Sequence, residues 1–260
     1  MIIPLRRFQN MKTLYIIVPC YNEEECLPGT APVFAEKVRS LIAAGAVSDT
    51  SRVLFVDDGS RDGTWALLEK YHREDPHCCA LRLNPNRGHQ NAVMTGLMVA
   101  KDICDITVTI DADLQDDINA IDEMVKKHGE GYPIVCGVRS RRNTDRFLKR
   151  FTARAYYRLM NLLGAKIIFD HADFRLMDRA ALNKLSHYHG EDLFLRGLAT
   201  RLGLPIATVY YDRSARVAGE SKYTLRKMMK LAMKGFTCGQ MKPMDTPRPP
   251  EDFIGEILLK

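Results

Sequence analysis

Short, continuous apolar runs alternate along the first half of the chain with longer segments in which apolar residues recur at helical spacing. A continuous apolar run is typical of a strand that is covered on both faces of a sheet. The alternation of the two patterns predicts an α/β domain with a mainly parallel central sheet flanked by helices. The runs predict strands over 14–19, 52–56, 79–83, 105–110 and 133–138, and the segments between them predict helices over 24–44, 64–74, 89–101 and 117–128.

The second half of the chain is less regular. Its pattern predicts helices over 145–163, 178–186, 191–201 and 224–236, strands over 172–177 and 205–211, a polar loop over 213–223, and an extended or disordered proline-rich stretch over 243–252. The segment 224–236 combines one apolar face with Lys and Arg elsewhere, which predicts a basic amphipathic helix. Such a helix can lie on an anionic membrane, or it can pack on the core or on a sister subunit in a homo-oligomer. The expected organisation is an extension over 1–12, the α/β domain over 13–212, the basic loop and helix over 213–242, and a proline-rich tail over 243–260.

Composition narrows the class of protein. The 260 residues are 46% hydrophobic and 27% charged, which excludes disorder of the whole chain. There is no apolar run long enough to span a bilayer and no secretory signal at the start, so a cytosolic protein is expected. The net charge of +6 is mild, but basic residues gather in 139–158 and in 213–234. Such stretches either attract phosphate groups or form solvated surfaces. Seven cysteines without a CxxC motif predict buried free thiols.

Two carboxylates follow the predicted strand 105–110, in the sequence DADLQD. Asp111 and Asp113 are two residues apart, and in extended backbone such residues share a face. Carboxylates held close together repel each other unless a cation lies between them, and hard oxygen ligands favour Mg²⁺ or Mn²⁺. Gln115 offers a further oxygen. The alternative interpretation is a set of acids at a helix N-terminus.

The first two strands also end in polar residues. Asp57 and Asp58 follow the second strand, and their carboxylates suit hydrogen bonds to a nucleobase or a ribose, although a capped turn explains part of the motif. The loop after the first strand contains an aromatic ring and an amide, which suit stacking on and hydrogen bonding to a nucleobase. Alternatively, the amide and the acids that follow it mark the start of a helix. Ligands of such sheets bind beyond the carboxyl ends of the strands.

Taken together, the segments VPCYNEEE, VDDGSRDGT and DADLQD resemble the family 2 glycosyltransferases of the GT-A fold over residues 14–138. The segments GVRSRR, ADFRLMDRAAL, LFLRGL and RVAGESKYTLRKMMKLAMKGFT resemble the polyprenyl-phosphate sugar transferase branch, which includes dolichyl-phosphate mannose synthases and bacterial undecaprenyl-phosphate glucosyltransferases. With them the resemblance extends over residues 14–243. A dinucleotide-binding interpretation fails because the first loop, PCYNEE, contains no glycine.

The resemblance implies roles residue by residue. The implied nucleotide-binding residues are Pro19, Tyr21, Asn22, Glu23, Asp57, Asp58 and Arg87. The implied metal and diphosphate residues are Asp111, Asp113 and Gln115. Arg139 is implied to lie near the acceptor phosphate, and Asp173 near the sugar. The loop that closes over diphosphate and acceptor is implied to contain Arg216, Ser221 and Lys222.

These residues imply a metal-dependent, inverting transfer of a hexose from a nucleotide sugar, with a UDP-sugar expected, to a polyprenyl phosphate at the cytoplasmic membrane face. A lipid phosphate is already an anion and needs no general base. Two alternatives stay open. The acid pair Glu191 and Asp192 departs from the branch, and Asp192 would be the general base if the acceptor were a hydroxyl. The remote alternative is a non-catalytic module that binds nucleic acid through the basic stretches.

Overall fold

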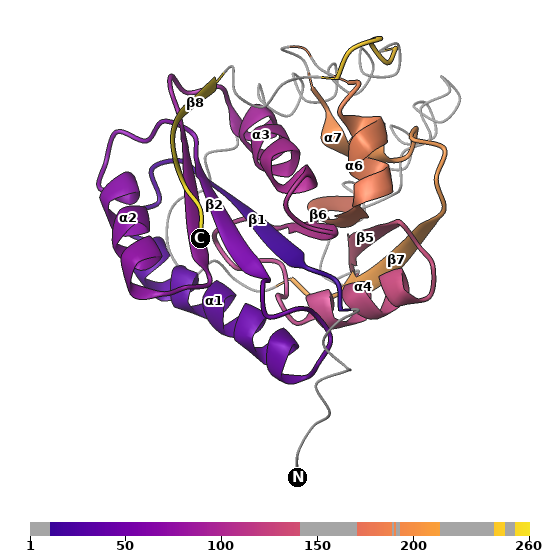
Figure 1. Cartoon of the computed structure of the whole chain (residues 1–260), viewed down its shortest axis with the longest axis horizontal. Coiled ribbons are helices and arrows are strands. Elements are labelled where there is room, and N and C mark those ends of the chain that lie inside the picture. Colours follow the sequence, from indigo (N-terminus) through magenta and orange to yellow (C-terminus); the bar gives the residue numbers. More distant parts are fainter. Residues whose placement is uncertain (1–10, 141–170, 189, 191–192, 214–241, 248–252) are drawn as a thin grey trace, which may run out of the picture.

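The computed structural model describes residues 11–140, 171–188, 190, 193–213, 242–247 and 253–260. These residues form one eight-stranded sheet with helices on both faces (Figure 1). The strands are β1 (Leu14–Cys20), β2 (Arg52–Asp57), β3 (Cys78–Leu83), β4 (Ile106–Thr109), β5 (Ile134–Arg139), β6 (His171–Asp178), β7 (Ile206–Tyr211) and β8 (Ile254–Leu258). The helices are α1 (Leu27–Ala43), α2 (Thr64–Glu74), α3 (His89–Lys101), α4 (Ala120–Gly129), α6 (Arg179–Leu185) and α7 (Leu195–Ala199).

The strand order is β7-β5-β6-β4-β1-β2-β3-β8. The central strands β4, β1, β2 and β3 are parallel to one another, as expected from strands joined by helices. Strand β6 lies between β4 and β5 and is antiparallel to both, and β7 is parallel to β5. The predicted α/β fold with a mainly parallel sheet is confirmed. The three loops that carry the sequence motifs follow β1, β2 and β4, which are neighbours in the parallel centre of the sheet.

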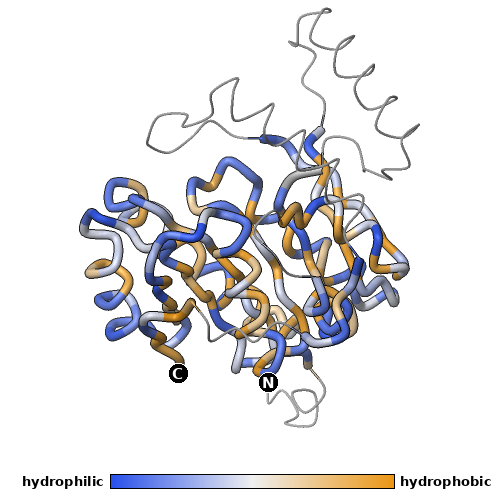
Figure 2. Tube along the Cα trace, turned by 90° about the horizontal axis from the view of Figure 1, so that it is seen from above, coloured by the Kyte–Doolittle hydropathy of each residue, from blue (hydrophilic) through white to orange (hydrophobic). Residues whose placement is uncertain are grey.

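The two faces of the sheet are filled by alternate residues of the same strands. On β1, Leu14, Ile16 and Val18 pack with α1, α2 and α4, whereas Tyr15 and Ile17 pack with α3, α6 and α7. Figure 2 shows apolar colouring within the interior of the molecule and polar colouring on many outer loops. A strand covered on both faces must be apolar at every position, which is why these strands were predictable from continuous apolar runs.

The end of the chain differs from the expected proline-rich tail. Residues 254–258 form β8, which pairs antiparallel with β3 and becomes the edge of the sheet. The strand is short and only partly buried, and Ile254 and Leu258 pack against the core on opposite faces of the sheet. The predicted helices over 145–163 and 224–236, including the basic amphipathic helix, lie outside the described residues.

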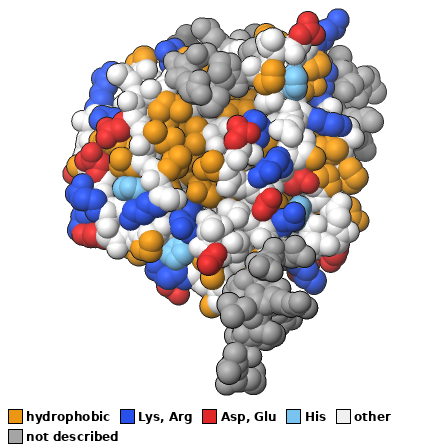
Figure 3. All heavy atoms as spheres, in the orientation of Figure 1, with side chains coloured by type: hydrophobic (Ala, Val, Ile, Leu, Met, Phe, Trp, Pro, Cys, Tyr) orange, Lys and Arg blue, Asp and Glu red, His pale blue; other side chains and the backbone are white. Residues whose placement is uncertain are grey.

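Two further expectations concern cysteines and membrane spans. Six of the seven cysteines are free and buried, as predicted, namely Cys20, Cys26, Cys78, Cys79, Cys104 and Cys136, and Cys238 lies outside the described residues. Over the described ranges, the helices are too short or too polar to cross a bilayer. Lys, Arg, Asp and Glu side chains are interspersed around apolar areas on the face shown in Figure 3.

Candidate active site

The three motif-bearing loops meet at one edge of the sheet. In the parallel register Cys20 of β1 lies beside Asp57 of β2, and Ile17 of β1 lies beside Thr109 of β4. The carboxyl ends of β4, β1 and β2 are therefore adjacent, and Asp111 follows β4 by two residues. The convergence that the sequence motifs predict is present in the fold.

Hydrogen bonds join the loop after β1 to the loop after β2. Asn22 has a positive φ of 54°, and its Oδ1 accepts a hydrogen bond from the Arg61 N–H at 3.0 Å. Its own N–H donates to Ser60 Oγ at 2.9 Å, and the Glu23 N–H donates to Thr64 Oγ1 at 2.9 Å. The two loops thus form one continuous wall, and part of the polar content of VPCYNEEE serves this structural purpose. Pro19 and Tyr21 are both partly exposed beside this wall.

Asp57 and Asp58 are buried and engaged within the protein. The Ser60 N–H donates to Asp57 Oδ1 at 3.0 Å, and Arg82 Nε lies 3.3 Å from Asp57 Oδ2. The Asp58 Oδ1 accepts a hydrogen bond from the Arg87 N–H at 2.7 Å. Burial raises the pKa of both carboxyls, against the hydrogen bonds from Ser60 and Arg87 that lower it. Their predicted contact with a nucleotide stays a prediction, because the observed contacts fix the loops.

The side chain of Arg87 lies against the end of the chain. Its guanidinium carbon is 4.4 Å from the centre of the Phe253 ring, and the Asn84 N–H donates to the Phe253 carbonyl at 3.1 Å. A cavity of about 680 Å³ lies beside this loop and is lined by residues 59–61, 82–86 and 255–256. The segment that ends in β8 is therefore part of the wall around Arg87, a contact that the sequence did not predict.

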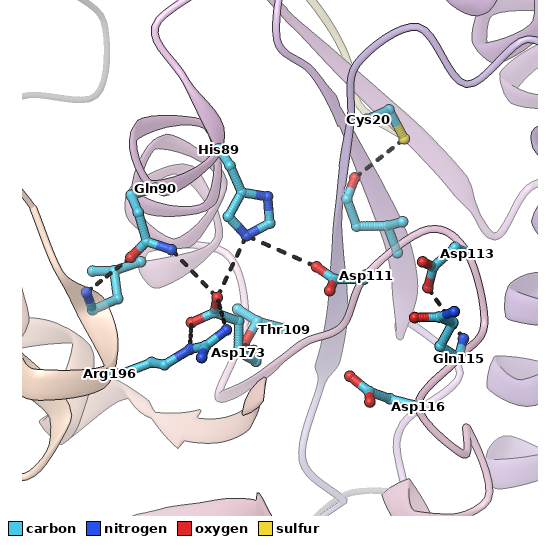
Figure 4. A network of polar contacts seen from close by, with 12 residues as sticks. Cys20, His89, Gln90, Thr109, Asp111, Asp113, Gln115, Asp116, Asp173 and Arg196 are labelled. Atoms are coloured by element: carbon cyan, nitrogen blue, oxygen red, sulfur yellow. Dashed lines mark hydrogen bonds and ion pairs between the residues drawn. The ribbon is translucent and has the colours of Figure 1, made fainter. Parts of the chain in front are cut away.

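Asp111, Asp113 and Gln115 occupy the turn after β4 (Figure 4). Leu114 adopts a positive φ of 50°, and Asp113 Oδ1 accepts a hydrogen bond from the Gln115 N–H at 3.1 Å. Gln115 Oε1 accepts a hydrogen bond from Arg213. Across the ranges that the structure describes, no three His, Cys, Asp or Glu side chains already form a metal-binding group.

The donor set nevertheless fits a hard cation. Desolvation raises the pKa of Asp111, and the charge of Asp173 adds to this effect against the opposing effect of His89. A cation relieves such crowding of negative charge, and carboxylate and amide oxygens are ligands that Mg²⁺ and Mn²⁺ prefer.

A second polar network adjoins Asp111, and most of it was missed from the sequence. Asp173 at the start of β6 is 11% exposed and forms a two-point ion pair with Arg196 of α7, with Nε–Oδ1 at 3.0 Å and Nη2–Oδ2 at 2.9 Å. Gln90 of α3 donates to Asp173 Oδ2 at 3.4 Å and accepts from the Leu195 N–H at 2.9 Å. The network ties α3, β6 and α7 together beside the predicted metal ligands.

His89 lies between the two acidic groups (Figure 4). Its Nε2 is 3.7 Å from Asp173 Oδ2 and 3.8 Å from Asp111 Oδ1. Desolvation alone would lower the pKa of His89, but the carboxylates of Asp173 and Asp111 outweigh it and raise this pKa to about 9. Burial likewise would raise the pKa of Asp173, but Arg196 and His89 hold it well below the usual range.

Arg139 is held by a buried acid. It donates from Nε to Asp116 Oδ1 at 3.0 Å, and Tyr211 Oη donates to the same oxygen at 2.7 Å. Burial alone would lower the pKa of Arg139, and the charge of Asp116 more than offsets this. Asp116 is only 2% exposed and Arg139 30% exposed, so the guanidinium keeps an accessible side. Of the other predicted site residues, Asp192, Arg216, Ser221 and Lys222 lie outside the described residues.

Solved structures share this fold. Glucosyl-3-phosphoglycerate synthase from Mycobacterium tuberculosis in complex with phosphoglyceric acid has a TM-score of 0.61 at 18% identity, over 92% of this chain and 90% of that one. Mannosyl-3-phosphoglycerate synthase from Rubrobacter xylanophilus has a TM-score of 0.61 at 18% identity, over 95% and 81%. A mannosyltransferase from Pyrobaculum calidifontis, solved with GDP-Man and Mn²⁺, has a TM-score of 0.57 at 19% identity, over 93% and 67%. The fold is therefore of the GT-A type that glycosyltransferases use.

Sequence comparison gives the family. The model of the family described as "Glycosyl transferase family 2" matches residues 15–186, so the chain belongs to this family. An uncharacterized glycosyltransferase of Bacillus subtilis, YkoT, is 46% identical over 91% of this chain and 70% of its own. The bactoprenol glucosyl transferase of Shigella phage SfV is 34% identical over 88% of this chain and 72% of its own. The protein is thus a glycosyltransferase with relatives in the polyprenyl-phosphate branch, and the non-catalytic nucleic-acid interpretation loses its support.

Proposed function

We propose that the protein transfers a hexose from a nucleotide sugar, with a UDP-sugar as donor, to a polyprenyl phosphate at the inner face of the cell membrane. The observation that carries the proposal is the convergence of Asp111 and Asp113 with the loops after β1 and β2 at one edge of the sheet. Support for the acceptor comes from relatives named bactoprenol glucosyl transferase. Support for the donor comes from fold neighbours solved with UDP or GDP-Man.

A divalent cation, Mg²⁺ or Mn²⁺, fits the oxygens of Asp111, Asp113 and Gln115. When bound, it stabilises the negative charge that develops on the departing diphosphate. The carboxylates would hold the ion, and the hydrogen-bonded loops after β1 and β2 would orient the donor. Arg87 and Arg139 supply positive charge on the two sides of the site, toward the nucleotide and toward the acceptor phosphate.

The transfer itself is one displacement. An oxygen of the acceptor phosphate forms a bond to the anomeric carbon while the bond from that carbon to the diphosphate breaks. The nucleoside diphosphate leaves with the bonding electron pair, and the configuration inverts. No proton moves, because the acceptor is an anion at neutral pH, so alignment and desolvation are the protein's main tasks. Membrane attachment through the basic segment 224–236 completes the proposal, and that segment lies outside the described residues.

The experiment combines purified protein, Mn²⁺, radiolabelled UDP-glucose and undecaprenyl phosphate, and extracts labelled lipid. Asp113→Asn should lower the rate about 100-fold or more, because a catalytic ion supplies several kcal/mol of charge stabilisation. The matched control is Asp102→Asn, at a carboxylate that is 72% exposed and paired only with Lys101 among described residues, and it should keep full activity.

Three outcomes would contradict parts of the proposal. Full activity of Asp113→Asn would refute the metal site. Label that reaches a glycan hydroxyl and is lost in Asp192→Asn would replace the phosphate acceptor with a hydroxyl. No turnover of any nucleotide sugar by the wild-type protein would refute the donor.

A further inference from the structure

His89 is the exposed member of the network that adjoins Asp111. It is the first residue of α3, and its side chain is 42% exposed, whereas that of Asp173 is 11% exposed. The carboxylate of Asp173 is already occupied by Arg196 and Gln90. The network therefore holds Asp173 in place, and the imidazole of His89 points toward both carboxylates (Figure 4).

His89 Nε2 lies beside two carboxylates without being within hydrogen-bond distance of either. Its Nε2 lies 3.7 Å from the Asp173 carboxylate and 3.8 Å from the Asp111 carboxylate, and both distances exceed a hydrogen bond. An oxygen placed about 2.8 Å from Nε2 can also reach one of these carboxylates at hydrogen-bond distance. The spacing of these atoms thus suits a bridging group that accepts from the imidazole and donates to a carboxylate.

The chemistry of the gap selects a hydroxyl over a phosphate. A hydroxyl donates and accepts, so it satisfies both the imidazole N–H and a carboxylate. A diphosphate at neutral pH has no proton to donate, so it cannot satisfy a carboxylate as well as the imidazole. In a glycosyltransferase the group that carries several hydroxyls is the sugar to be transferred.

We propose that His89 is a specificity-determining residue that hydrogen-bonds a hydroxyl of the transferred hexose, with Asp111 or Asp173 as the second partner of that hydroxyl. This proposal rests on the proposed function and names the residue that distinguishes one sugar from another. Gln90 and Arg196 act as positioning residues, because they hold Asp173 and reach the hydroxyl only through it.

The test measures equilibrium binding by calorimetry in the presence of Mn²⁺. Replacing His89 by Ala should leave the affinity for UDP, which carries no hexose, unchanged, and should weaken UDP-glucose about two- to tenfold, the loss expected for one hydrogen bond. Four UDP-deoxyglucoses, each lacking one hydroxyl of the sugar, identify the contact. For the analogue that lacks the partner hydroxyl, His89→Ala should cause no further loss. His89→Gln, which keeps an N–H donor, should retain part of the affinity.

The matched control is His72→Ala. The His72 ring contacts the Cys78 carbonyl at the start of β3, at the opposite edge of the sheet from the site, so this variant should bind every ligand as the wild type does. An equal loss for UDP and UDP-glucose, or the same loss for all four deoxy analogues, would overturn the role of His89 while leaving the proposed function intact. A wild-type protein that binds UDP but no nucleotide sugar would overturn both.

Discussion

The ion pair between Asp173 and Arg196 offers a direct test of how the site is held together. Two short contacts join the side chains, and both carboxylate oxygens take part. Arg196→Met keeps most of the apolar stem and removes the charge. In this variant the Asp173 side chain, which is 11% exposed, loses its charged partner. Among the described side chains Gln90 then remains as its hydrogen-bond donor, and His89 lies nearby.

The expected loss of stability is set by burial. Removing one partner of a fully buried pair costs about 3–5 kcal/mol, because the other charge stays behind without compensation. Arg196 is 28% exposed and His89 remains 3.7 Å from the carboxylate, so we expect a smaller value. We place the loss at about 2–4 kcal/mol in the free energy of unfolding.

The pH dependence of this loss gives the prediction its sign. The pKa of Asp173 is depressed in the folded protein, so its contribution to stability is present above the unfolded value and is lost as the pH falls through the folded value. In Arg196→Met the folded pKa rises, and protonation relieves the buried charge. The deficit should therefore be full at about pH 7 and clearly smaller near pH 4.

The assay is urea denaturation of the wild type and the variant at both pH values. The control is Arg39→Met, which removes a more exposed pair with Asp75 and should cost about 0–1 kcal/mol. An Arg196→Met loss no larger than that of the control, or one that does not change with pH, would refute the assignment of a buried, charge-dependent pair.

Two further predictions concern packing and the donor side. Gly96→Ala should lower the free energy of unfolding by about 1–3 kcal/mol, because the new Cβ would lie 2.7 Å from a methyl of Val56. The control is Gly129→Ala, where the new Cβ would have no heavy atom within 4 Å. An unchanged denaturation midpoint in Gly96→Ala would contradict the close packing. Phe253→Leu should raise KM for the nucleotide sugar about two- to fivefold at unchanged kcat, because a cation–π contact with the Phe253 ring holds Arg87. Phe253→Tyr keeps an aromatic ring and should have the wild-type KM. Equal kinetics of Phe253→Leu and wild type would show that the ring does not position the guanidinium.

The sequence by itself determined the central sheet and the place of its chemistry. Strands such as Leu14–Cys20 and Arg52–Asp57 contain continuous apolar runs because helices cover both of their faces, and this local signal survives without tertiary information. Parallel strands joined by helices must present their carboxyl ends at one edge. The motifs that begin at Asp57 and Asp111 follow such strands, so the apolar pattern alone is enough to place them at the same edge of the sheet.

Only the tertiary structure decided which side chains complete the site. His89 and Gln90 belong to none of the motifs above, and Arg196 lies in the segment LFLRGL without a predicted role. They meet Asp173 because α3 and α7 pack on the same face of the sheet. The pairing of Gln90 with Leu195 spans 105 positions in the chain, a separation over which local periodicity gives no information. Strand β8 is a second case, since it pairs with β3 across more than 170 positions in the chain, and the five-residue segment by itself does not say which strand it joins. Local patterns record what each segment must bury, whereas contacts between distant polar groups depend on how the buried faces come together.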